Sequence, residues 1–233
     1  MNYQGYLNNY FQTIFSRLFE AMYREDIHTT NELQTVSNVI NDITENCDVE
    51  NLQPQLRDFL MAVLQELANS LDPNTFPLRL TNDAKENFQS FLGSLIQILI
   101  VNLRAEINQD LATNIVNLVT TLFDNNRKVV YGGLLIIHAL IVVLEKNFET
   151  FLPQVGNYLV TSIVNFEDEN CGRFACGLVS DLSNFLEGNM KNYAANFMSC
   201  LNTVLSNNNY QTETKLHAMI AVGDICLAID SSF

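Results

Sequence analysis

Five acidic side chains recur at matching places in the second half of the chain. An acid directly follows the last apolar residue of three similar stretches, and a second acid recurs earlier in two of them; these residues are Glu145, Glu187, Asp230, Asp181 and Asp224. Such a row of carboxylates suits a long basic peptide or a basic protein surface, because many weak ion pairs together steer and align a partner. The alternative is that the same acids cap helices or mark solvated helix ends.

The net charge favours the same class of partner. Acidic residues outnumber basic ones 26 to 12, which gives a formal charge of −14. A charge of this sign repels nucleic acid and anionic lipid and attracts basic proteins. The sequence therefore predicts no nucleic-acid partner and no membrane partner. The surplus could also serve only to keep an apolar chain in solution.

No pattern in the sequence indicates catalysis or a cofactor. There is no glycine-rich phosphate loop, no GxSxG and no HExxH motif, and the histidines are far apart, at His28, His138 and His217. The five cysteines form no CxxC pair, and several lie in apolar runs, where a thiol acts as a small hydrophobic group. We expect no enzyme, no metal site and no cofactor, a core position for His138, and a reducing compartment.

The composition indicates that helices carry these residues. Hydrophobic residues make up 48% of the chain and charged residues 16%, and only 9 Gly and 4 Pro are present, which is sparse for a β-rich fold. The N-terminus has no basic start followed by an apolar core, so no secretory signal is predicted. The longest apolar runs, 98–103 and 134–144, are shorter than a membrane span of roughly 20 residues. We expect a soluble intracellular protein.

The chain aligns with itself at a spacing of about 42 residues. Placing Phe148 on Met190 without a gap also aligns Leu159 with Leu201. The aligned positions step by three and four, as one face of a helix does. The motif LQPQLRDFL at 52–60 likewise resembles FLPQVGNYL at 151–159. A period of this length indicates stacked units rather than a single closed core.

This period predicts five helix pairs. We expect first helices near 3–24, 51–71, 106–124, 149–166 and 190–206. We expect second helices near 30–46, 84–104, 127–146, 169–187 and 211–230. The segment 128–144 has a strand-like composition, but its register with the other repeats favours a helix. We also expect an insertion at 72–83. The predicted fold class is all-α, an α-α superhelix (HEAT/armadillo-like solenoid). It forms a single module over 1–233, with repeats near 1–48, 49–104, 105–147, 148–188 and 189–233.

The segment 151–188 resembles a HEAT repeat, with Pro153 early in the first helix, Glu167 or Asp168 closing that helix, and Arg173 opening the second. The stretches CGLVSDLSNFLEGNM, HAMIAVGDICLAIDSSF and QSFLGSLIQILIVNL resemble second helices of the importin-β (karyopherin-β) family. The resemblance covers most of the chain and is strongest from 130 to 233. Proteins of that family are several times longer, and the last pair lacks the polar cap that ends an array. We therefore expect a fragment of a longer array.

The resemblance implies a nuclear import receptor, found in the cytoplasm, the nucleus and the nuclear pore. Such a receptor carries basic cargo, or importin-α through its basic segment, under the control of the small GTPase Ran. Second helices of the family line a concave side, which implies a partner-binding role for Asp181, Glu187, Asp224, Asp230 and Glu145. Grooves between first helices would bind Phe-Gly nucleoporins, although Phe151, Tyr158 and Phe197 are expected in the core.

Two other functions stay open at this level. A HEAT-repeat scaffold or adaptor subunit of another protein complex would show the same repeats and the same acidic surplus. A helical enzyme could assemble its site from residues that are distant in the sequence.

Overall fold

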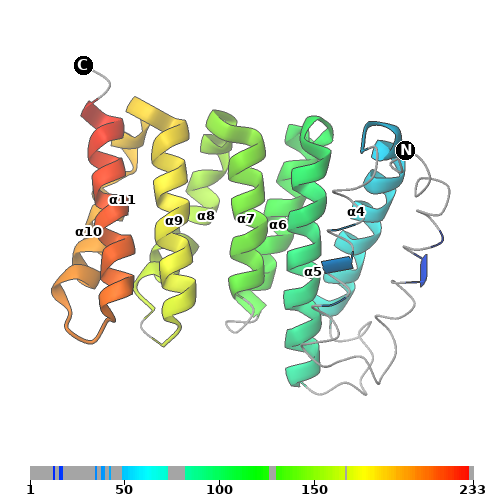
Figure 1. The fold of residues 1–233 in the computed structure, drawn as a ribbon, viewed down its shortest axis with the longest axis horizontal. Helices are drawn as coiled ribbons and strands as arrows, with labels where there is room; N and C mark the ends of the chain where they lie inside the picture. The colour runs from blue at the N-terminus through cyan, green and yellow to red at the C-terminus, as the bar shows by residue number, and fades with distance from the viewer. Residues whose placement is uncertain are drawn as a thin grey trace. The chain divides into compact units, whose positions relative to one another are not determined.

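The computed structural model describes residues 49–72, 82–125, 130–165 and 167–230, with Thr13, Ser16, Arg17, Thr35, Asn38, Val39 and Asp42. Apart from these seven single residues, the helices expected near 3–24 and 30–46 lie outside the described residues, as does most of the expected insertion at 72–83. Every regular element in the described ranges is a helix (Figure 1). The predicted all-α class is therefore confirmed.

The chain divides into two compact units, and the boundary between Ala139 and Leu140 lies inside a helix. The first unit contains α4 (Val49–Leu71), α5 (Asn82–Leu103), the 3₁₀ helix η1 (Arg104–Glu106), α6 (Gln109–Asn125) and most of α7 (Val130–Leu144). The second contains the end of α7, η3 (Glu145–Phe151), α8 (Leu152–Ile163), α9 (Glu169–Leu186), η4 (Glu187–Asn192), α10 (Ala194–Ser206) and α11 (Thr212–Asp230). The strand-like run is thus helical, as its register with the other repeats predicts.

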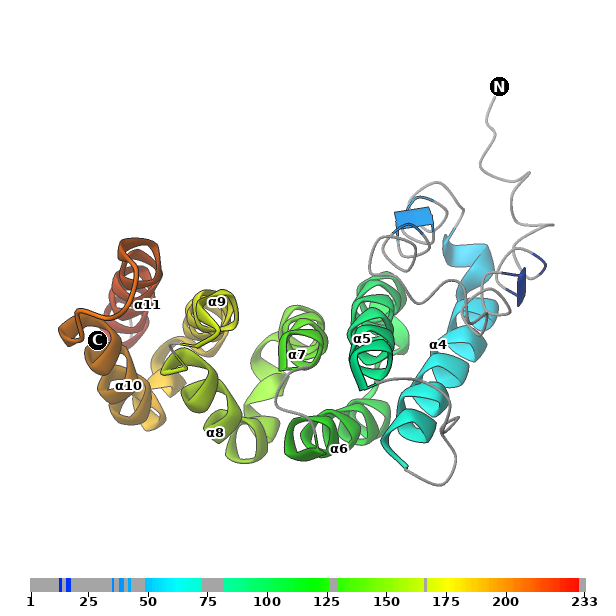
Figure 2. The ribbon, with the colours of Figure 1, turned by 90° about the horizontal axis from the view of Figure 1, so that it is seen from below.

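Two helix pairs of the second unit stack in two layers. α8 packs on α9 and α10 packs on α11, and the pairs meet where α8 contacts α10 and α9 contacts α11. Seen along the helices, α8 and α10 lie in one row and α9 and α11 in the other (Figure 2). The apolar residues that follow Phe148 at steps of three and four are all buried, as is Phe148 itself; they are Phe151, Val155, Leu159 and Ile163. The periodic apolar stripe is therefore the core of this unit.

Two apolar stretches, Asn82–Glu106 and Val130–Ile163, are long enough by composition alone to cross a membrane. Within the fold, 56% and 50% of their most apolar windows are buried. The core of the first unit includes Leu95 and Ile96 of α5 and Leu134 of α7. Burial of this extent is typical of helices that other helices cover on most sides.

The buried thiols are packing groups. Cys171, Cys176 and Cys200 are free and buried, whereas Cys226 is exposed on α11. Burial raises the pKa of Cys176 to about 12 and the pKa of Cys200 to about 11. Both thiols therefore stay protonated at neutral pH, and a protonated thiol is a poor nucleophile and a poor metal ligand. This agrees with the small hydrophobic role that their sequence context indicates.

Gly93 on α5 and Gly132 on α7 lie where two helix backbones of the first unit meet. A Cβ atom on Gly93 would lie 2.8 Å from the carbonyl oxygen of Gly132, and one on Gly132 would lie 3.2 Å from Cα of Ser90. Backbone atoms cannot swing aside as a flexible side chain can. The contact between α5 and α7 consequently depends on the absence of a side chain at Gly93.

Replacing Gly93 by Ala is expected to destabilise the chain. Overpacking costs about 1–3 kcal/mol, which exceeds the roughly 0.5–1 kcal/mol that alanine gains over glycine inside a helix. Gly177→Ala on α9 is the control, because a Cβ atom there meets no atom within 4 Å and should raise stability. Urea unfolding followed by far-UV circular dichroism measures both. A Gly93→Ala variant as stable as the parent would contradict the close contact.

Candidate functional site

The recurring acids Glu145 and Glu187 lie where a second helix ends and the next repeat begins. Each is the first residue of a 3₁₀ helix and directly follows a buried leucine, Leu144 or Leu186. Their φ angles are +49° and +48°, a region that L-residues with long side chains rarely adopt. The recurrence of the acid therefore coincides with a recurring joint of the backbone.

The other predicted acids lie on the second helices. Asp181 and Asp224 occur the same number of residues into α9 and α11, two helices in contact, and both are half-buried. Glu145, Glu187 and Asp230 are exposed. Among the described residues, no hydrogen bond or ion pair is made by the carboxylates of Glu145, Glu187, Asp224 and Asp230. In that part of the chain, no three acidic, His or Cys side chains come together as a metal site.

The acidic turn before α9 has structural roles. Asp168 is the N-cap of α9, where its carboxylate accepts a hydrogen bond from the N–H of Cys171 at 3.2 Å. The side chain of Asn165 accepts from the N–H of Glu167 at 3.2 Å. The HEAT-repeat resemblance expects Glu167 or Asp168 to close the first helix. α8 instead ends at Ile163 and Asp168 begins α9, because its carboxylate satisfies a free N–H of that helix.

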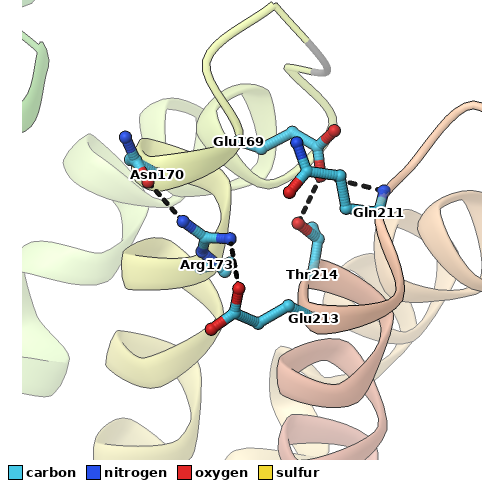
Figure 3. A network of polar contacts seen from close by, with 6 residues as sticks. All are labelled: Glu169, Asn170, Arg173, Gln211, Glu213 and Thr214. Atoms are coloured by element: carbon cyan, nitrogen blue, oxygen red, sulfur yellow. Dashed lines mark hydrogen bonds and ion pairs between the residues drawn. The ribbon is translucent and has the colours of Figure 1, made fainter.

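A polar network joins the start of α9 to the start of α11 (Figure 3). The carboxylate of Glu169 accepts hydrogen bonds from the N–H of Gln211 at 3.0 Å and from the hydroxyl of Thr214. Arg173, which the HEAT resemblance places at the opening of the second helix, donates to the carboxylate of Glu213 at 3.0 Å. Two successive second helices are therefore joined at this end by charged hydrogen bonds.

A groove of about 710 Å³ lies between α8 and α10. Its lining combines apolar groups with amides and hydroxyls: Leu152, Pro153, Gly156, Asn157, Val160, Val164, Asn192, Tyr193, Asn196, Phe197, Ser199, Cys200 and Thr203. A Cβ atom on Gly156 would meet no atom within 4 Å, so the groove is open above this residue. This volume is typical of ligand sites, which range over roughly 300–1,000 Å³. The lining can take an apolar side chain and hydrogen-bond the peptide groups beside it.

Hydrogen bonds between the two repeats lie at both ends of this groove. Before α8, Glu149 accepts from the side-chain amide of Asn189 at 2.8 Å and from the hydroxyl of Tyr193 at 3.5 Å. After α8, the hydroxyl of Tyr210 donates to the carbonyl of Val164 at 2.5 Å. Burial, followed by the charge of Glu149, raises the pKa of Tyr193. Its hydroxyl therefore stays protonated and able to donate.

No sequence motif pointed to Glu149, Glu169 or Tyr210. Their hydrogen bonds span 40 residues to Asn189, 42 residues to Gln211 and 46 residues to Val164. These separations are close to the repeat period of about 42 residues. A search of the sequence for polar residues one period apart could therefore have identified these three residues. Of the aromatic residues expected in the core, Phe151 and Phe197 are buried and Tyr158 is half-buried.

α11 carries an exposed apolar stripe. Four large side chains are 50–69% exposed, namely Leu216, Met219, Ile220 and Leu227. The opposite side of the helix is buried and contains Ala218, Ala221 and Ile225. This face of α11 is therefore apolar and exposed, as the absence of polar capping residues in this part of the sequence predicts.

Comparison with known proteins identifies relatives of the whole chain. A family model described as importin subunit beta-1-like, TPR repeats, matches residues 2–233. Importin subunit beta-1 of Arabidopsis thaliana is 26% identical over 234 residues, which cover 97% of this chain and 26% of that protein. The chain thus spans about a quarter of the length of this relative.

Solved structures share the fold at 21% identity. A crystal structure of importin beta has a TM-score of 0.84 and is matched over 97% of this chain and 27% of that chain. A Kap95:Nup1 complex has a TM-score of 0.76, and a structure of Kap95p binding RanGDP has one of 0.72; each is matched over 94% of this chain and 25% of that chain. The predicted solenoid fold of HEAT type is confirmed by these likenesses.

Replacing Glu187 by Gly is expected to stabilise the chain, because glycine adopts a positive φ without steric cost. A non-glycine residue held there costs of order 1–3 kcal/mol, and the added freedom of the unfolded chain offsets part of this, which leaves a gain of about 1 kcal/mol. Glu187→Gln removes only the charge and is the control, expected within about 0.5 kcal/mol of the parent. Thermal and urea unfolding compare the three chains. A Gly variant less stable than the Gln variant would show that the joint is unstrained.

Proposed function

The chain belongs to the importin subunit beta-1-like family, and from this premise we propose that it is a protein-binding segment of a nuclear import receptor. The proposed receptor carries basic cargo or importin-α through nuclear pores, moves between cytoplasm and nucleus, and is controlled by Ran. The match over residues 2–233 is the observation that carries the proposal. Because the chain spans 26% of the curated relative, we assign it binding surfaces rather than the whole transport cycle.

The α8–α10 groove is the proposed site for Phe-Gly nucleoporins. Gly156 leaves open space on the α8 side of this groove and Phe197 lines it from α10, so that a phenylalanine side chain can enter between the two helices. Asn157 and Asn196 line the same groove and can hydrogen-bond the flanking peptide groups. Full burial of one such side chain contributes roughly 1.5–3 kcal/mol. The solved complex of Kap95 with Nup1 supports this class of partner.

Filling the groove tests this assignment. Gly156→Leu is expected to lower the affinity for a Phe-Gly repeat peptide by about tenfold or more, a loss of about 1.4 kcal/mol in binding free energy. The fold should be undisturbed, because a Cβ atom at this position meets nothing within 4 Å. Gly177→Leu has an equally open Cβ on α9, outside the groove lining, and is the matched control. Fluorescence anisotropy of a labelled peptide measures the affinity. Unchanged binding by Gly156→Leu would remove the groove from the proposal.

The recurring acids are the proposed surface for a basic partner, either basic cargo or the basic segment of importin-α. They are Glu145, Asp181, Glu187, Asp224 and Asp230, on or directly after second helices. Four of these carboxylates have no partner among the described residues, and the net charge of −14 adds long-range attraction. Exposed ion pairs contribute only about 0–1 kcal/mol each. Binding would therefore depend on several of them acting together.

Ran is the proposed regulator. The solved structure of Kap95p binding RanGDP supports this partner. In the proposed mechanism Ran and cargo bind differently to two states of the repeat array, so that each lowers the affinity for the other. The direction of transport would then follow from the state of Ran in each compartment.

Neutralising four acids together is expected to lower the affinity for a lysine- and arginine-rich peptide by more than about tenfold. Each single change should lower this affinity by less than about fivefold. The four changes are Glu145→Gln, Glu187→Gln, Asp224→Asn and Asp230→Asn. Binding by the parent should also weaken with salt, since the Debye length falls from about 8 Å at 0.15 M to about 3 Å at 1 M. The neutralised variant should show less salt dependence, measured by titration calorimetry.

The matched control neutralises four exposed acids elsewhere on the chain, namely Asp58, Asp83, Asp110 and Glu167. It makes the same change in net charge and should leave most of the affinity. An equal loss in both variants would show that only the total charge matters, which would contradict a specific acidic surface.

A further inference from the structure

Glu149 connects the two repeats that form the α8–α10 groove. It lies in η3, directly before α8, and both of its carboxylate oxygens face residues that precede α10. Oε2 accepts a hydrogen bond from Nδ2 of Asn189 at 2.8 Å, and Oε1 accepts one from the hydroxyl of Tyr193 at 3.5 Å. Tyr193 itself lines the groove. The contact therefore ties the beginning of one groove wall to the beginning of the other.

We propose that Glu149 is a positioning residue that holds α8 and α10 at the spacing at which the groove accepts its ligand. The inference rests on the proposed function of the groove and adds the residue that sets its width. Glu149 is not among the residues that line the groove in the described structure. It therefore acts on the ligand only through the helices.

The geometry of the groove explains why one contact has this influence. The far end of α8 is held separately, because the hydroxyl of Tyr210 donates to the carbonyl of Val164 at 2.5 Å. With both contacts present, α8 is fixed at two points relative to the next repeat. Without Glu149, the beginning of α8 keeps only its apolar packing, and it can shift there more than at the end that the Tyr210 contact still holds. Gly156 would change its distance from Phe197 across the groove.

The chemistry of Glu149 suits this role. An ionised carboxylate forms hydrogen bonds that are shorter and about twice as strong as those between neutral groups. Glu149 is half-buried, which reduces competition from water for its oxygens. The residue aligned with Glu149 one repeat later is Lys191, an ammonium group that cannot accept a hydrogen bond. The contact is therefore a property of this groove and not of every repeat.

Exchange of donor and acceptor tests the inference in the full chain. Glu149→Ala removes the acceptor and is expected to lower the affinity for a Phe-Gly repeat peptide about tenfold, which corresponds to about 1.4 kcal/mol. Asn189→Asp places two carboxylates against each other and is expected to lower this affinity at least as much. The double variant Glu149→Gln with Asn189→Asp restores an N–H···O contact in the opposite sense. Its affinity should return to within about threefold of the parent.

Two further measurements separate positioning from a general loss of stability. All variants are compared well below their unfolding temperatures, where a residue needed only for stability would leave the peptide affinity unchanged. Spin labels on the exposed residues Gln154 and Ala195 report the spacing of α8 and α10, with Cys47 and Cys226 replaced by Ser. Glu149→Ala should broaden this distance distribution, and the double variant should narrow it again.

The outcomes distinguish this inference from the proposed function. If Gly156→Leu abolishes peptide binding while Glu149→Ala binds like the parent, the positioning role is overturned and the groove assignment stands. Failure of the double variant to recover affinity would also overturn the positioning role. A parent chain that does not bind the peptide would overturn both.

Discussion

The burial of one helix pair against the next is the interaction on which the second unit depends. α9 and α11 lie in contact, and their buried residues include Val179 and Leu182 on one helix and Ala221 and Ile225 on the other. A single helix pair could not bury these groups. One side of each helix faces the next pair in the stack and would be exposed to solvent without that pair. No charged side chain is among the fully buried residues in the described part of the chain. The polar contacts that Glu149 and Glu169 make between repeats lie beside helix ends.

The two layers of this unit have different properties as a result. α9 and α11 pack more closely on each other than α8 and α10 do, so the open groove lies between the first helices. One layer thus maintains the stack, and the other leaves space for a ligand. Glu169 supports the closed layer through Thr214, whereas Glu149 supports the open layer through Asn189. In both layers a carboxylate beside the start of a helix reaches a residue of the next repeat.

The helices and their buried faces could be predicted from the sequence because apolar spacing determines both. α7 illustrates this, since its composition favours a strand while its register with α9 requires a helix. The details of the site could not be predicted in the same way. The positive φ of Glu187 depends on the path of the backbone, and the partner of Glu149 depends on how two repeats stack. Gly93 has no local pattern that distinguishes it from a glycine with open space around it, such as Gly177.

The joints at Glu145 and Glu187 also limit how such a chain can change in length. A second helix passes there into a 3₁₀ helix without an intervening loop. One inserted residue would rotate the following helix by about 100° and turn its apolar face away from the stack. At the other edge of the pairs, residues 164–165, 167–168 and 207–211 lie outside the helices, and an added residue can project into solvent. Insertions and deletions among homologues should therefore accumulate at one edge of the repeats and spare the other.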